Sequence, residues 1–439
     1  MKKFVFLFLI SIFLQSCMGV NSDIQTIKIK EEPPAREWTF IIYMAADNDL
    51  EQYAIHNFNQ LEAVRYGNAP ISIIVLLDRS PYYDQTNGNW SDTRLFEIIS
   101  DPEGHSPIMK SPRLNSWELG LFVDKDTDLN TADWRVLSGL IDFAKRVYPA
   151  EHYALFIWGH GTGWSSIAHD DTSKDSMSLP DFRRAIAGKN LSVIGFDTCF
   201  GAVLEVVYEI KDHAELFIGS QGLIPASGWD YYALFTDFIQ NPDLSISNLG
   251  KSIQKQFSEL DIYNPNAAIS QIQLSQVGNL FNKFENFTGI AANSITTFES
   301  REAVSNVILN DVEGHFFVPT PSELYIDIFD FSKKITAIRT AITSNSSQQN
   351  AILNASNELE EALNLAVPLS WAHNGTTNKI AVHVIHILDQ AVPASRHRDG
   401  YIRGSVAMDK CNFVQHSTGW VPAVPLSNSF LDKLFYWEF

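Results

Sequence analysis

The chain has 439 residues and a formal net charge of −19, because 51 Asp and Glu outnumber 32 Lys and Arg. A strongly negative chain repels a phosphate backbone, so we expect no nucleic-acid partner. The hydrophobic fraction of 45% supports a large core, and the length exceeds the ~250–300 residues at which one core stops growing. The three cysteines, Cys17, Cys199 and Cys411, are too few for a disulfide framework.

The amino terminus has the pattern of an exported lipoprotein. Lys2 and Lys3 precede an apolar run at 4–14 that is too short to span a bilayer, which takes ~20 residues. The run ends in Leu14-Gln15-Ser16-Cys17, which resembles a bacterial lipobox with a lipidated cysteine. We therefore expect a lipoprotein signal peptide at 1–17 and an extracytoplasmic protein anchored to a membrane, on the periplasmic face or the cell surface. The alternative is an ordinary signal peptide that contains a cysteine.

The next segments alternate between apolar strands and helices. Residues 18–37 are polar, charged and proline-containing, which is typical of a tether. The pattern then predicts strands at 38–44, 71–77, 94–99, 153–158, 191–196 and 216–218, and helices at 50–66, 130–148 and 201–211. Continuous apolar strands separated by helices indicate an α/β fold with a mostly parallel sheet covered by helices on both faces. We assign this domain to residues 38–241.

The pattern changes from about residue 242. Strands are expected at 267–274 and 380–387, and helices at 277–287, 335–342 and 351–366, with a polar link at 344–350. We expect residues 242–439 to form an additional α/β region.

Two of the predicted strands end in residues suited to catalysis. Working groups of α/β sheets gather at the carboxyl ends of the strands. His160 follows one strand between two glycines, where it could act as general acid and base while the Gly161 amide helps to form an oxyanion hole. Cys199 follows another strand and precedes a predicted helix, whose positive end would favour the nucleophilic thiolate. A structural turn histidine and a buried structural cysteine are the alternatives.

Four segments together resemble the clostripain family of cysteine peptidases. They are WTFIIYMAADNDLE (38–51), ALFIWGHGTGW (154–164), IGFDTCFGAVLEVVYEIKDHAELFIGSQ (194–221) and GWDYY (228–232). The resemblance extends weakly through 268–284 and 325–335 and implies a caspase-like fold, because the family shares a clan with caspases, gingipains and legumain. It also implies a His160–Cys199 dyad, oxyanion donors at the amides of Gly161 and Cys199, and cleavage of protein or peptide substrates after Arg or Lys.

Specificity depends on the residues near the cysteine. A carboxylate at Asp197 suits the floor of a pocket for the basic P1 side chain, whereas capping of the next helix is the ordinary alternative. Many family members carry acidic residues after the following strand, but this chain has Ser220-Gln221-Gly222-Leu223-Ile224-Pro225 there. Asp230 is the nearest downstream substitute. A less acidic pocket with a non-basic P1 preference is therefore an alternative, as is a non-catalytic surface binding module on the same fold.

Processing and metal binding complete the expectations. Relatives are cleaved between the histidine and the cysteine, and Lys174 is the only Lys or Arg from Asp170 through Asp181, so Lys174–Asp175 is our candidate for autocleavage within a polar surface loop. The His160–Cys199 dyad requires no cofactor.

Metal binding is a separate expectation. Some relatives use calcium, and the carboxylates available for it are those of Asp47, Asp49, Asp170 and Asp171, although capping and solvation also explain them. His383 and His386 face opposite sides of a predicted strand, so we expect no zinc site. The oligomeric state is left open.

Overall fold

A computed structural model describes most of the chain from residue 36 onward. The described residues are 36–101, 103, 106–241, 243–259, 267–310, 314–316, 323–373, 379–385 and 430. The expected signal peptide with Cys17, nearly all of the expected tether at 18–37, His386 and Cys411 lie outside them.

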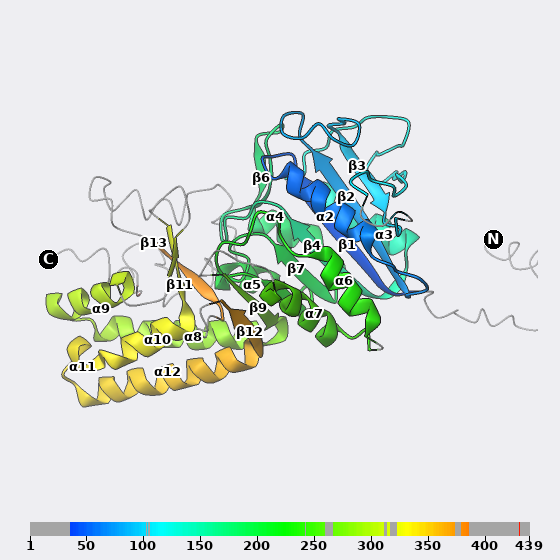
Figure 1. The fold of residues 1–439 in the computed structure, drawn as a ribbon. Coiled ribbons are helices and arrows are strands. Elements are labelled where there is room, and N and C mark those ends of the chain that lie inside the picture. The colour runs from blue at the N-terminus through cyan, green and yellow to red at the C-terminus, as the bar shows by residue number, and fades with distance from the viewer. Residues whose placement is uncertain are drawn as a thin grey trace, which may run out of the picture. The chain divides into compact units, whose positions relative to one another are not determined.

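The centre of the molecule is one eight-stranded sheet with the order β12-β9-β8-β7-β4-β1-β2-β3 (Figure 1). Its strands are β1 (Arg36–Ala46), β2 (Ile71–Arg79), β3 (Thr93–Glu97), β4 (Ala150–Trp158), β7 (Val193–Asp197), β8 (Leu216–Gly219), β9 (Ala268–Gln273) and β12 (Leu369–Ala372). The five strands from β8 to β2 are parallel, whereas β3 and β9 pair antiparallel to their neighbours. The mostly parallel sheet predicted from the sequence is confirmed.

Helices cover both faces of this sheet, which explains why β1 and its neighbours are apolar along their whole length. One face packs against α2 (Glu51–Ala63), α6 (Tyr231–Gln240) and α7 (Ile246–Glu259) (Figure 1). The other packs against α3 (Trp134–Val147), α4 (Leu179–Ile186), α5 (Leu204–Ile210) and α8 (Leu274–Ser294). Capping side chains mark several helix starts: Asp133 accepts a hydrogen bond from the amide of Arg135, and Ser178 accepts one from that of Asp181.

The carboxyl-terminal region adds strands to the same sheet as well as elements of its own. β9 and β12 extend the central sheet, so the sheet continues across the boundary expected after residue 241. A three-stranded sheet contains β10 (Gly314–Phe316), β11 (Glu323–Asp327) and β13 (Ala381–Ile385), and the remaining helices are α9 (Phe298–Asn310), α10 (Ile328–Ala337), α11 (Arg339–Ile342) and α12 (Ser346–Ala366).

Two predicted local features were wrong. Helix α12 begins inside the segment expected to be a polar link, because the Asn345 side chain accepts hydrogen bonds from the amides of Ser347 and Gln348. The polar segment after His160 is not a simple surface loop. It contains the hairpin β5 (Ile167–Asp170) and β6 (Asp175–Met177), and Asp170 is 2% exposed.

Candidate active site

A cavity of about 470 Å³ opens where β1, β4 and β7 end. The predicted catalytic, oxyanion and pocket residues that line it are His160, Gly161, Asp197 and Cys199, and two of the candidate cation ligands, Asp49 and Asp171, line it as well. The sheet order explains this convergence, because β4 lies between β1 and β7 and all three run parallel. The two motifs that the sequence places at separate strand ends therefore share one hollow.

Glycines allow the two motif loops to approach closely. Gly159 has a φ of 137°, and a Cβ there would lie 2.8 Å from the Ala45 carbonyl oxygen. A Cβ on Gly161 would lie 2.6 Å from Thr198 Oγ1 and 2.7 Å from the Cys199 carbonyl oxygen. The backbone after the histidine is thus in direct contact with the backbone that carries the cysteine.

His160 is hydrogen-bonded to an acid that sequence analysis interpreted as a helix cap or cation ligand. Its Nε2 lies 2.6 Å from Asp49 Oδ1. Asp49 in its ionised form only accepts, so the neutral imidazole carries its proton on Nε2 and keeps Nδ1 free as a base. The His169 ring lies 5.8 Å from the His160 ring, and burial is the main cause that lowers the pKa of His169.

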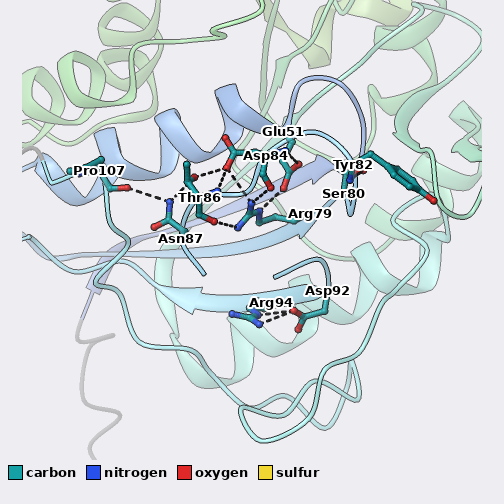
Figure 2. A network of polar contacts seen from close by, with 10 residues as sticks. All are labelled: Glu51, Arg79, Ser80, Tyr82, Asp84, Thr86, Asn87, Asp92, Arg94 and Pro107. Carbon is teal, nitrogen blue, oxygen red and sulfur yellow. Dashed lines mark hydrogen bonds and ion pairs between the residues drawn. The ribbon is translucent and has the colours of Figure 1, made fainter. Parts of the chain in front are cut away.

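A buried ion pair between Arg79 and Glu51 fixes the start of α2 (Figure 2). Arg79 Nε donates to Glu51 Oε1 at 2.5 Å, and both side chains are fully buried. The same guanidinium donates to the carbonyl oxygens of Asp84 and Thr86, while Glu51 Oε2 accepts from the Asp84 amide. Burial is the largest influence on Glu51 and raises its pKa in spite of Arg79. These contacts bind the loop after β2 to the helix that follows Asp49.

Cys199 is partly buried, and no helix begins directly after it to activate its thiol. The predicted helix begins at Leu204, after the N-cap Val203, so the thiol precedes the first turn by several residues. Burial raises the pKa of Cys199, and the Asp197 charge adds to the rise, although the Ile224 amide donates to Sγ at 3.4 Å. The expectation of a dipole-stabilised thiolate was wrong because the chain does not become helical directly after β7.

Hydrogen bonds to the loop after β8 hold the segment after Cys199 in an irregular shape. Phe200 has a φ of 54°, its amide donates to the Gly222 carbonyl, and the Ala202 amide donates to the Ser220 carbonyl. Because of the left-handed backbone at Phe200 and these long-range hydrogen bonds, the helix begins several residues after Cys199. Neither feature can be predicted from local periodicity.

Asp197 forms the buried acidic part of the cavity. Its carboxylate is 2% exposed and accepts hydrogen bonds from the Trp229 amide and the Tyr231 hydroxyl, at 3.1 Å each. Burial raises the pKa of Asp197 to about 7. No Lys, Arg or His among the described residues forms an ion pair with it. It does not cap α5, whose N-cap is Val203 without a side-chain hydrogen bond.

A glycine leaves the Asp197 carboxylate open to the cavity. Gly228 has a φ of 63°, and a Cβ there would lie 2.6 Å from Asp197 Oδ2. The remainder of this wall is apolar and consists of Leu223, Ile224, Pro225 and Ala226. Gln221 points elsewhere, since its Nε2 donates to the buried Asp327.

The second predicted pocket acid does not line the cavity. Asp230 is the N-cap of α6, where its side chain accepts from the Ala233 amide. Its assignment to substrate binding is therefore wrong, and the ordinary role of a helix cap explains it.

Lys174 and Asp175 lie in the β5–β6 hairpin and do not line the cavity. Lys174 is exposed with a φ of 53°, and the Asp175 carboxylate accepts from the Asn130 side chain. A peptide bond must become extended to enter a protease cleft, so this turn would have to open before cleavage.

The four proposed cation ligands do not form one site, because their carboxylates contact different partners. Asp49 bonds His160, Asp171 accepts from the Tyr83 hydroxyl, and Asp170 accepts from Thr131 and Ser173. Only Asp47 belongs to a compact acidic group, whose other members, Asp78 and Asp128, were not predicted. Asp47 and Asp78 come together because β1 and β2 are neighbours in the sheet.

The carboxyl-terminal region supports the active-site loops from behind. Tyr325, in β11, donates from its hydroxyl to the Thr162 carbonyl at 2.8 Å, and its ring stacks on Phe200 at 4.7 Å. The Ala381 amide donates to the Ala202 carbonyl. Tyr325 thus contacts both the loop after His160 and the loop after Cys199, a role that no sequence motif indicated.

Within the part of the chain that is described, none of the helices combines the length and apolar character needed to traverse a bilayer.

The clostripain family model matches residues 42–395. The curated relative "Clostripain" of Hathewaya histolytica is 24% identical over 222 residues, which are 45% of this chain and 41% of that protein. The chain therefore aligns with less than half of the length of that relative.

Two solved structures confirm the fold. An inactive zymogen C11 protease from Parabacteroides distasonis superposes with a TM-score of 0.60 at 16% identity, covering 88% of this chain and 99% of that one. A secreted C11 cysteine protease from Bacteroides thetaiotaomicron, in complex with an irreversible peptide inhibitor, has a TM-score of 0.57 at 18% identity and covers 84% and 97%. With the family model matched over most of its length, the chain belongs to the clostripain family of cysteine peptidases.

Proposed function

We propose that this chain is a cysteine endopeptidase that uses His160 and Cys199 to cleave peptide bonds after Lys or Arg. One observation carries the proposal: a base, a thiol and a buried carboxylate without a cationic partner among the described residues line the same cavity. The family match supports the reaction class. The pocket chemistry supports the choice of side chain at P1.

The mechanism follows from the state of each group. The Cys199 thiol loses its proton to His160 as the sulfur attacks the scissile carbonyl carbon, because burial keeps the free thiol protonated. The tetrahedral intermediate collapses when His160 returns the proton to the departing amine, which leaves a thioester on Cys199. Water then hydrolyses the thioester with His160 as base, and the carboxylic acid product departs.

The amides of Gly161 and Cys199 are our candidates for the oxyanion hole. Gly161 packs against the Thr198–Cys199 backbone, so a carbonyl at Cys199 Sγ would lie close to both loops. Amide donors of this kind contribute about 10²- to 10³-fold to kcat in acyl transfer.

Asp197 is the proposed ligand of the basic P1 side chain. A buried carboxylate pays a desolvation penalty unless a charge partner enters, and a P1 ammonium or guanidinium would supply that partner. Gly228 provides the opening through which the side chain would reach it. The apolar wall at Leu223 and Ile224 would contact the methylene stem of Lys or Arg.

The same apolar wall favours one alternative, a peptidase with a non-basic P1 preference. A non-catalytic binding module is the remaining alternative, but it would not require both His160 and Cys199. A peptide library varied at P1, read with the wild type and Cys199→Ala, separates the three. Cleavage confined to Lys and Arg and absent from the variant is expected. Variant-sensitive cleavage after other residues would overturn the specificity, and no variant-sensitive cleavage would overturn the enzyme.

We also propose autocleavage at Lys174–Asp175. The exposed hairpin turn is accessible, and Lys174 fits the basic P1 preference. Lys174→Gln should leave the chain intact by mass spectrometry, whereas Lys125→Gln, at another exposed lysine, should still be cut. Unchanged fragments from Lys174→Gln would exclude this bond.

Lipidation of Cys17 and export are further proposals, which follow from the lipobox-like ending of the apolar run. In a bacterial host fed with alkynyl palmitate, the wild type should acquire the label and sediment with membranes. Cys17→Ala should do neither. A labelled Cys17→Ala variant would contradict the assignment.

A further inference from the structure

Two tyrosines project into solvent beside the cavity and have no role in the reaction proposed above. Tyr82 and Tyr83 follow β2 and are 73% and 50% exposed. Their rings meet edge to face, with the centroids 6.5 Å apart. The Tyr83 hydroxyl donates to Asp171 Oδ2 at 3.0 Å, and Asp171 lines the cavity. The two rings therefore form one exposed aromatic surface at the rim of the cavity, unlike the single exposed apolar side chains that are ordinary on protein surfaces.

The loop that carries the two tyrosines is fixed by buried polar contacts. Arg79, at the end of β2, donates to the carbonyl oxygens of Asp84 and Thr86. Glu51 Oε2 accepts from the Asp84 amide at 2.8 Å. Figure 2 shows the Tyr82 side chain pointing away from these contacts. A surface held in this way loses little freedom when a ligand binds, and a tyrosine side chain has only two torsions to restrict.

The order of the strands places the two tyrosines on the side of the leaving group. The carboxyl ends of the parallel strands follow one another as β8, β7, β4, β1 and β2. The proposed P1 pocket lies at the β7 and β8 ends, His160 follows β4, and the tyrosines follow β2. His160 protonates the departing amine in the proposed mechanism, so the substrate beyond the scissile bond continues past His160, away from the P1 pocket. The tyrosines lie farther along the same row of strand ends.

The spacing of the strands indicates which substrate residues would reach this surface. Neighbouring strands lie about 4.8 Å apart, so three steps across the sheet place β2 about 14 Å from β7. An extended peptide covers that distance in about four residues, at roughly 3.3–3.6 Å each. Fewer residues suffice here, because the Tyr83 side chain reaches back to Asp171 on the cavity wall. The second and third residues after the scissile bond, P2′ and P3′, fall within this range.

We propose that Tyr82 and Tyr83 form a substrate subsite that binds a large apolar side chain, most strongly an aromatic one, at P2′ or P3′. The subsite rests on the proposed function, because it assigns the leaving-group side of the same cleft. A tyrosine ring offers apolar area, and offset or edge-to-face contact with a second ring adds to the gain from burial. The Tyr83 hydroxyl is bonded to Asp171, so the ring and not the polar end of this residue is offered to the substrate.

Two kinds of substrate separate this subsite from the P1 pocket and from the catalytic dyad. A peptidyl-Lys aminomethylcoumarin amide has a leaving group without P′ residues, whereas quenched fluorescent peptides with the same sequence up to Lys carry Gly, Gln or Phe at P2′ or P3′. Both kinds give the same acyl-enzyme, so the P′ preference acts on acylation alone and is read in kcat/KM. We expect Phe to exceed Gly about tenfold at one of the two positions. Equal values for Gly and Phe, or a Gln peptide as good as the Phe peptide, would overturn the proposal.

Variants then assign the preference to the tyrosines. In Tyr82→Ala the ratio of kcat/KM for the Phe peptide to that for the Gly peptide should fall below about threefold. Trp117→Ala is the matched control, because Trp117 is 84% exposed between β3 and α3 but does not line the cavity, and it should keep the ratio of the wild type. A general loss of folded enzyme cancels in this ratio.

The outcomes distinguish the subsite from the function on which it rests. An unchanged ratio in Tyr82→Ala would overturn the subsite. Cleavage of the coumarin amide without any preference at P2′ or P3′ would overturn the subsite alone. No cleavage of either kind of substrate would overturn the proposed function, and the subsite with it.

Discussion

The cavity has two walls that prepare their catalytic groups in opposite ways. The His160 wall, formed by Asp49, His160, His169 and Asp171, is polar and open to water: the side chains of His160 and Asp49 are 39% and 66% exposed. The Cys199 wall, formed by Asp197, Cys199, Ile224 and Gly228, is less exposed: Asp197 is 2% exposed, and Cys199 and Ile224 are partly buried.

The two walls therefore differ in what sets the properties of their catalytic groups. On the His160 wall a hydrogen bond to Asp49 orients the base, while solvent screens the charges. On the Cys199 wall desolvation dominates, and it raises the pKa of both Cys199 and Asp197. Substitutions on the buried wall should therefore have larger effects than those on the exposed wall.

The largest effect is expected from Asp197→Asn. The amide keeps the size of the side chain but cannot pair with a cation, and removing one partner of a buried charge pair costs about 2–5 kcal/mol. We expect kcat/KM for Lys and Arg substrates to fall about 30- to 4,000-fold, and that for a neutral P1 substrate to change less than about threefold. Equal losses for both classes would show that Asp197 is structural, and thermal unfolding of the variant would reveal it.

Gly228→Ala tests access to the same carboxylate without changing it. The added methyl would lie 2.6 Å from Asp197 Oδ2, so we expect at least a tenfold lower kcat/KM for basic substrates. Gly188→Ala is the matched control, because Gly188 also has a positive φ, 71°, but nothing within 4 Å of its Cβ position. Both variants should carry a similar backbone strain of about 1–2 kcal/mol. Similar kinetic losses in both would attribute the effect to strain.

The pH dependence of Asp197 has a defined sign. Its pKa of about 7 means that the free enzyme holds a neutral acid below that pH. Basic P1 substrates need the carboxylate, so the ratio of kcat/KM for Lys to that for a neutral residue should rise up to about tenfold per pH unit below 7 and level off above it. Asp197→Asn should make this ratio independent of pH. A ratio that is already flat in the wild type would contradict the assignment.

The same shift also affects stability. Since the folded pKa exceeds the unfolded value of 3.8, the native state keeps a proton that the unfolded state loses between pH 4 and 7. The contribution of Asp197 to the free energy of unfolding therefore decreases as pH rises through that window, by up to about 1.4 kcal/mol per unit, and is constant above it. The difference in stability between wild type and Asp197→Asn, measured at pH 5 and pH 8, gives this change directly.

The sequence predicted the part of the molecule that local patterns determine. The apolar runs at β1, β2, β4 and β7 identify a parallel sheet, and strand ends identify where His160 and Cys199 must meet. Asp197 lies near the thiol because it ends β7 only two residues before Cys199. These features need only the periodicity of single segments.

The remainder depends on which distant segments become neighbours. The helix after Cys199 starts late because the backbone at Phe200 pairs with Gly222. Asp49 reaches His160 because β1 adjoins β4, and Asp47 meets Asp78 because β1 adjoins β2. Asp230 misled the prediction because a capping carboxylate and a pocket carboxylate look identical in sequence.

The smallest effect is expected from Asp49→Asn, on the exposed wall. Exposed ion pairs and hydrogen bonds contribute about 0.2–1 kcal/mol, so kcat should fall about two- to fivefold while KM stays unchanged. Asp171→Asn, which removes an equal charge from the same cavity without touching His160, is the matched control and should leave kcat within about 1.5-fold. Asp49→Glu should restore part of the loss if the carboxylate orients the imidazole. A loss above about 100-fold would place Asp49 within the catalytic machinery itself and would reverse the contrast between the two walls, since solvent would then not be screening this pair.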